Sequence, residues 1–184
     1  MGNYFSGELS LNSSPEHRKE MVNLIELLCH RKSYNDETCF LAVNIADRFL
    51  GVIATKRMQT PPYLLLAVTV TVLAAKITES SVPCYDLTVS LLPDFLQQKV
   101  TKDQFRILEG NILTLLEFSL HYNCPMLFMS RYARVLGLDS GDYGTIRTWA
   151  TKLCLLLQRE TVYLEIKPSQ VAAACLMFAV NMAD

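Results

Sequence analysis

MQTPPYLLLAVTVTVLAA, residues 58–75, is the stretch that decides the fold. It carries no charged side chain, and Lys76 is the first charge after it. A helix at a protein surface shows polar residues along one side, whereas this segment is apolar or small all round. The alternating Val and Thr residues would suit a buried strand, but the apolar run is longer than a typical strand. We therefore expect a helix that other helices enclose, with Pro61 and Pro62 in its first turn.

The composition is typical of a folded chain with a large core. Of its 184 residues, 51% are hydrophobic and 19% are charged, which argues against disorder. Lysine and arginine number 17 against 18 acidic residues, so the basic excess that nucleic-acid-binding proteins use is missing. The six cysteines show no C-x-x-C spacing and are expected to be free, buried thiols. We expect no metal site, no cofactor and no nucleic-acid partner.

The first half of the chain shows the spacing of five helices. The first begins at Ser14, and the second carries Leu41, Ile45 and Phe49 inward and ends before Gly51. The uncharged helix is third, and a short fourth helix follows it and is closed by Pro93. The fifth begins at Thr101 with a capping box, a threonine followed three residues later by a glutamine.

The second half resembles part of the first. One helix opens at Pro125, a long one runs from about residue 142 to 164, and a last one starts at Pro168. This last helix, like the central one, has a proline at its start and then alanines and large apolar residues, which makes a weak internal repeat. No pattern alternates strands with helices, so we predict an all-α protein. The expected organisation is a flexible segment over residues 1–13, a bundle over 14–123 and a partial second bundle over 124–184.

Four segments carry a resemblance to the cyclin family. LAVNIADRFL at residues 41–50 resembles the family's LAVNxxDRFL, and LAAKITE at 73–79 resembles its LASKYEE. The segment 108–120 resembles MExxxLxxLxFxL, and residues 163–174 look like the start of the third helix of a second cyclin box. The resemblance implies the cyclin fold, a five-helix bundle around a central third helix, followed here by a truncated second helical repeat.

The resemblance also implies a binding site. In the family, the lysine and glutamate that match Lys76 and Glu109 face a kinase and hydrogen-bond backbone groups beside its regulatory C helix. Spacing alone would favour two solvated charges near helix ends, and it is the resemblance that favours the binding role. The function implied is a regulatory subunit that binds and activates a cyclin-dependent Ser/Thr protein kinase in cell-cycle control, in the nucleus and the cytoplasm. The alternative is a cyclin-fold transcription-associated or scaffold protein that activates no kinase.

A second pair of charges has an expected structural role. Arg18 lies at the family's spacing before Asp47, and the family uses such a pair to lock the first helix to the second. An arginine can bind a carboxylate through two parallel hydrogen bonds, and two buried ions need each other. The alternative interpretation is two unrelated surface charges.

The family's substrate-docking groove is altered in this chain. The groove lies on the first helix, whose start usually reads MRAIL, whereas residues 17–21 here read HRKEM. Leu24 takes the place of a tryptophan, and Leu64 replaces a glutamine. These departures argue against docking of the usual arginine–x–leucine peptides. We expect at most a degenerate groove formed by Met21, Leu24 and Leu64.

Two further features concern membranes and catalysis. The start MGNYFS fits the myristoylation pattern M-G-x-x-x-S, so a membrane contact is expected only if Gly2 is acylated. One acyl chain alone would anchor the protein weakly. The chain contains no H-E-x-x-H, G-x-S-x-G or phosphate-loop motif, and we expect neither catalytic residues nor enzymatic activity.

Overall fold

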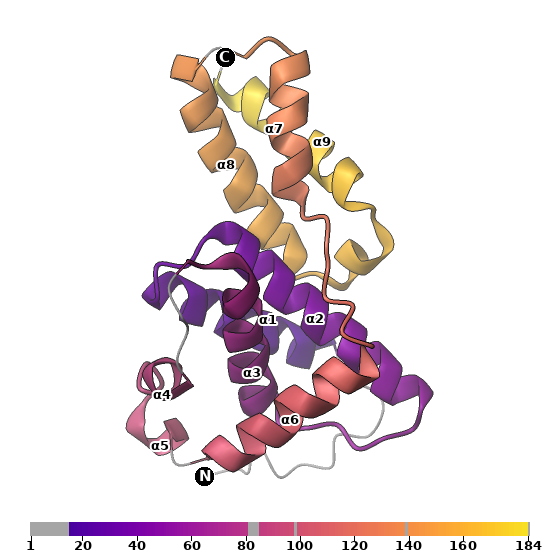
Figure 1. Ribbon diagram of the computed structural model, residues 1–184. Coiled ribbons are helices and arrows are strands. Elements are labelled where there is room, and N and C mark those ends of the chain that lie inside the picture. The colour runs from indigo at the N-terminus through magenta and orange to yellow at the C-terminus, as the bar shows by residue number, and fades with distance from the viewer. Residues whose placement is uncertain (1–14, 81–84, 98, 139, 184) are drawn as a thin grey trace. The chain divides into compact units, whose positions relative to one another are not determined.

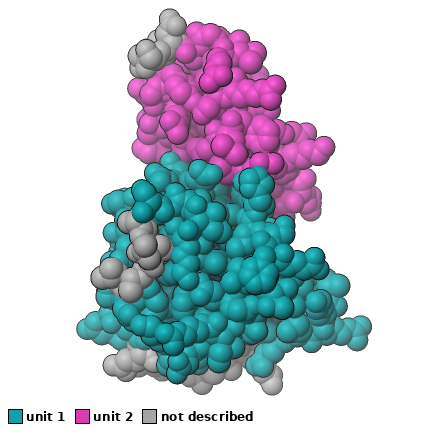
Figure 2. Space-filling model, in the orientation of Figure 1, with its two compact units in different colours: residues 1–122 teal, residues 123–184 magenta. Residues whose placement is uncertain are grey.

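The computed structural model describes residues 15–80, 85–97, 99–138 and 140–183, and within these ranges all regular structure is helical (Figure 1). The chain divides into two compact units, residues 1–122 and 123–184 (Figure 2). This division lies one residue before the boundary expected from the sequence. The elements of the first unit are α1 (Pro15–Arg31), α2 (Asp36–Thr55), α3 (Tyr63–Thr78), α4 (Tyr85–Val89), α5 (Asp94–Gln97) and α6 (Lys102–Leu115). Those of the second are α7 (Pro125–Val135), α8 (Ser140–Gln158), the 3₁₀ helix η1 (Thr161–Glu165) and α9 (Pro168–Ala183).

Helix α3, uncharged from Tyr63 to Ala75, is the core of the first unit. Every residue from Tyr63 to Ala75 is buried, and α3 contacts α1, α2, α4 and α6 (Figure 1). The hydroxyls of Thr69 and Thr71 donate to the carbonyl oxygens four residues earlier, both at 2.7 Å, so these two buried threonines are satisfied within α3 itself. The prediction of an enclosed central helix in an all-α fold is confirmed.

The ends of α2 and α3 differ from the sequence-based prediction. Helix α3 begins at Tyr63, so both prolines precede it; Pro62 is the N-cap and has an extended ψ of 130°. A residue before a proline is pushed out of the helical region, which keeps Pro61 outside the helix. Helix α2 continues through Gly51 to Thr55. Glycine inside a helix costs about 1 kcal/mol, and burial of Ile53, which is 2% exposed, offsets this cost.

Two other segments also differ from expectation. The short helix expected before Pro93 is α4, which ends earlier, at Val89, and a further short helix that was not expected, α5, follows Pro93. A proline lacks the N–H that would continue a helix and suits the start of the next one. The long helix expected to run to residue 164 ends at Gln158. There the amides of Arg159 and Glu160 bond to carbonyls only three residues back, the tighter 3₁₀ pattern that η1 then continues.

A carboxylate joins the end of α3 to the start of α2. Glu79, the C-cap of α3, accepts hydrogen bonds from the backbone N–H of Asn35 at 2.7 Å and from its Nδ2 at 3.2 Å. It also accepts one from the Thr38 hydroxyl. Amides at a helix N-terminus lack partners within the helix, and the positive end of the helix dipole favours an anion. Glu79 therefore caps α2 from another helix and fixes the angle between the two.

Five of the six cysteines, at positions 29, 39, 124, 154 and 175, are buried and free, while Cys84 and Gly2 lie outside the described residues. Hydrogen bonding to Cys29 and burial raise the pKa of Cys39, so its thiol stays protonated. Among the described residues, no group of three or more His, Cys, Asp or Glu side chains is placed to hold a metal ion. Helix α2 is long and apolar enough to cross a membrane, but 56% of that window is buried inside the protein, as in a core helix.

The packing of α3 predicts a contrast between two substitutions on that helix. Leu66 is fully buried, so Leu66→Ala should lower the free energy of unfolding by about 2–5 kcal/mol through lost burial and a cavity. Ile77 is 54% exposed, so Ile77→Ala should cost less than about 1 kcal/mol. Urea denaturation followed by circular dichroism would measure both changes. Similar losses at the two positions would contradict the enclosed position of α3.

Candidate functional site

Two charged side chains meet where α3 leaves the core. Lys76 lies in the last turn of α3, where the helix dipole favours a cation, and Glu109 lies in the middle of α6. The Lys76 Nζ and the Glu109 Oε1 are 2.6 Å apart. The lysine side chain is 42% exposed and the glutamate side chain 18% exposed. The structure thus brings together the two residues that the sequence singled out, as an ion pair at the surface of the first unit.

An aromatic ring on α6 packs next to this ion pair. Phe105 lies one helical turn before Glu109 on α6 and is 5% exposed. The Lys76 Nζ lies 5.9 Å from its ring centroid, within the range of a cation–π contact. The Phe105 ring packs in turn against Tyr85, with centroids 4.8 Å apart. Sequence reasoning missed this role of Phe105, although its i, i+4 spacing to Glu109 placed the two on one face of α6.

The ion pair keeps unused hydrogen-bonding capacity. An ammonium group has three donors, and a carboxylate accepts at both oxygens. Within the described part of the chain, Lys76 donates only to Glu109 Oε1, and no donor reaches Oε2. Ile77 and Ile107, on the same two helices, are 54% and 65% exposed. The pair can therefore donate to a carbonyl and accept from an N–H of another molecule, on helices that also offer apolar surface.

Arg18 and Asp47 form a second, buried pair. The Arg18 Nε donates to Asp47 Oδ1 at 2.9 Å, and its Nη2 donates to Oδ2 at 2.8 Å. The side chains are 7% and 13% exposed. Burial raises the pKa of Asp47, and the Arg18 guanidinium opposes that shift. The structure brings these residues together in the two-bond geometry of arginine and carboxylate, joining α1 to α2.

The three positions of the expected degenerate groove offer little open surface. Met21 is 1% exposed and Leu64 is 2% exposed, because α1 packs against α3. The His17 ring also stacks on Tyr63 at 5.7 Å, at the start of α3. Only Leu24 is partly exposed. An apolar peptide side chain would therefore find one of the three residues accessible in this structure.

Comparison with known proteins identifies the family. Residues 2–121 match the family model for the cyclin N-terminal domain. The chain belongs to the cyclin family. This cyclin is 31% identical to Cyclin-B2-1 of Oryza sativa subsp. japonica over 178 residues, which cover 96% of this chain and 39% of the relative. It is 32% identical to Cyclin-D1-1 of Arabidopsis thaliana over 145 residues, covering 78% of this chain and 42% of that protein.

The cyclin spans about two-fifths of the length of these curated relatives. Its fold is similar to the crystal structure of a viral cyclin from herpesvirus saimiri, with a TM-score of 0.76 and 17% identity. The match covers 93% of this chain and 72% of that chain. At this identity the likeness concerns the fold, and it agrees with the helical architecture of both units.

The buried pair predicts a strong effect of removing one partner. Asp47→Ala leaves the Arg18 guanidinium buried without its carboxylate, so the free energy of unfolding should fall by about 3–5 kcal/mol. The variant with both Arg18→Ala and Asp47→Ala should lose less than the sum of the two single losses, because no ion remains unpaired. Chemical denaturation of the four proteins would measure the coupling. Additive losses, or an unchanged Asp47→Ala protein, would refute the pairing.

Proposed function

We propose that this cyclin is a regulatory subunit that binds and activates a cyclin-dependent Ser/Thr protein kinase in cell-cycle control. The observation that carries the proposal is the Lys76–Glu109 pair, exposed at the junction of α3 and α6 with unused donors and an unused acceptor. The names of relatives such as the G2/mitotic-specific cyclin-B3 of Gallus gallus, 27% identical over 148 residues, support the link to the cell cycle.

The proposed mechanism is a shift of population in the kinase. A protein kinase is active when a glutamate of its C helix pairs with the lysine that binds the ATP phosphates. A partner that binds only the state with this helix turned inward increases the share of that state. Raising an active state from 1% to 99% takes a preference of about 10⁴-fold, or about 5.5 kcal/mol.

The site offers the contacts that such a preference needs. Lys76 would donate to a backbone carbonyl of the kinase, and Glu109 would accept from a backbone N–H beside the C helix. The exposed side chains of Ile77 and Ile107 would lose water on binding, and this burial of apolar area would help to offset the entropic cost of association. Water excluded around the pair strengthens its hydrogen bonds to the partner. The protein would thus act by binding, in the nucleus and the cytoplasm, and perform no chemistry of its own.

Replacing both charges tests this proposal. Lys76→Ala with Glu109→Ala should reduce kinase activation at least tenfold, because the donors and the acceptor for the partner are removed together. The fold should survive, since exposed ion pairs contribute about 0–1 kcal/mol, and the melting temperature should fall by less than about 4 °C. Co-purification with tagged cyclin-dependent kinases and phosphorylation of a generic substrate would measure binding and activation.

Lys152→Ala provides a matched control. Lys152 also lies over an aromatic ring, 5.2 Å from the centroid of Trp149, so this variant removes a similar lysine from the second unit. It should activate the kinase as the unaltered protein does. Full activation by the double variant would refute the assignment of the site. If the unaltered protein bound the kinase without activating it, that result would instead favour a scaffold function.

A further inference from the structure

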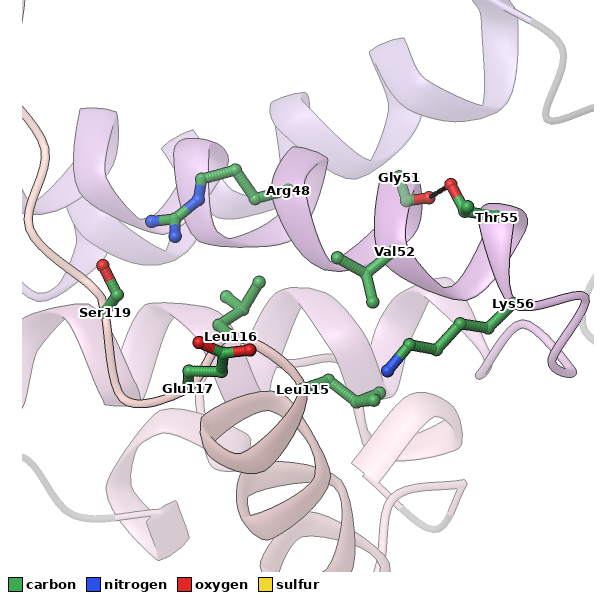
Figure 3. Close-up of a pocket in the computed structure, with 9 residues that line it drawn as sticks. All are labelled: Arg48, Gly51, Val52, Thr55, Lys56, Leu115, Leu116, Glu117 and Ser119. Atoms are coloured by element: carbon green, nitrogen blue, oxygen red, sulfur yellow. Dashed lines mark hydrogen bonds between the residues drawn. The ribbon is translucent and has the colours of Figure 1, made fainter.

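A second candidate site lies on the first unit, between the C-terminal part of α2 and the end of α6. A cavity of about 740 Å³ opens there (Figure 3). The lining residues Arg48 and Val52 of α2 and Lys56, the C-cap directly after it, follow at spacings of four, so they lie along one side of that helix. Figure 3 shows Arg48 and Lys56 at opposite ends of the cavity, with Val52 between them and Leu115 of α6 across from it.

The charges of this cavity are not used within the fold. Among the described residues, no side chain or backbone group pairs with the Arg48 guanidinium or the Lys56 ammonium. The Glu117 carboxylate, at the rim beside α6, is likewise without a partner in the described part of the chain. Two cations against one carboxylate leave the cavity with a positive balance. It therefore favours an occupant that carries negative charge.

Gly51 keeps one wall of the cavity open. It lines the cavity from inside helix α2, where glycine is less favourable than alanine. A Cβ atom added at this position would meet no other atom within 4 Å. Packing within the chain therefore does not require the glycine, and the space above it is free for an occupant.

The rim opposite α2 has an unusual backbone. Glu117 and Phe118 are consecutive non-glycine residues with φ values of 54° and 57°, in the left-handed region. The Phe118 amide donates to the Leu113 carbonyl at 2.8 Å and the Ser119 amide to that of Leu116 at 2.9 Å, which holds the turn closed. Phe118, between the lining residues Glu117 and Ser119, is 73% exposed. Such strained turns occur preferentially at binding sites, and this one presents Glu117 and Ser119 to the cavity.

We propose that this cavity binds an extended peptide segment of a partner protein with acidic residues at positions 1 and 5 and an apolar residue at position 3. Arg48 on α2 and its C-cap Lys56 are eight residues apart, or about 12 Å along the helix axis. An extended peptide rises about 3.3 Å per residue and presents alternate side chains on one side, so positions 1 and 5 are about 13 Å apart. The acidic side chains meet Arg48 and Lys56, and the apolar one packs against Val52 and Leu115.

Fluorescence polarisation with a labelled probe tests this assignment on the full chain. The probe is the peptide Gly-Glu-Ser-Leu-Ser-Glu-Gly, and its binding should saturate below about 1 mM. Arg48→Gln and Lys56→Gln should each weaken binding by about three- to tenfold. Glu117→Gln should strengthen it by about two- to fivefold, because a repelling carboxylate is removed. Binding should weaken as salt increases, since the charges are partly exposed.

Two substitutions of Gly51 distinguish weaker peptide binding caused by filling the cavity from weaker binding caused by a disturbed fold. Gly51→Met places a flexible apolar chain in the open space and should reduce binding at least tenfold, while Gly51→Ala should bind within about twofold of the unaltered protein. A matched peptide with lysines in place of both glutamates should not bind. Absence of saturable binding, equal binding of both peptides, or unchanged binding by Gly51→Met or Arg48→Gln would each overturn the proposal. A dimer that Gly51→Met dissociates would assign the cavity to a second copy and also overturn it.

Discussion

Enclosure of the uncharged part of α3 is the constraint on which the first unit depends. Because α3 is buried over thirteen consecutive residues, from Tyr63 to Ala75, its neighbours must be held around it on several sides. Two polar interactions help to hold these neighbours in place. The Arg18–Asp47 ion pair joins α1 to α2, and the Glu79 carboxylate at the end of α3 caps the start of α2. Lys76 is the residue at which α3 emerges from the core. The position of the candidate kinase-binding pair therefore follows from the place where the buried helix ends.

The sequence predicts those features of this structure that depend on local composition. The absence of charge marked α3, and the Thr101–Gln104 spacing marked the start of α6, where the structure has the capping box. The extension of α2 past Gly51 was missed because tertiary burial outweighs the local preference of glycine. The support of Lys76 by Phe105 and the cavity beside α2 also escaped prediction. Both depend on which helix packs against α6, and periodicity within one helix carries no information about that.

Helix α6 takes part in both candidate sites of the first unit. Its buried stripe of Phe105, Leu108 and Ile112 packs toward the core, with α3 as its main partner. Glu109 lies beside this stripe in the middle of the helix, and Leu115 at its end lines the cavity. A change in the packing of α6 would therefore disturb two surfaces at once. This shared support is the physical reason to test binding and stability together in every variant.

The threonines of α3 have a consequence for how freely such a protein can diverge. Their hydroxyls are satisfied inside the helix, so the side chains packed against Thr69 and Thr71 need to supply only apolar contact of suitable volume. Cores tolerate many combinations of hydrophobic residues when total volume is kept. Residues at neighbouring positions can then be substituted during evolution without leaving a buried polar atom unpaired. A shared architecture at 17% identity with a viral protein is the outcome that this freedom allows.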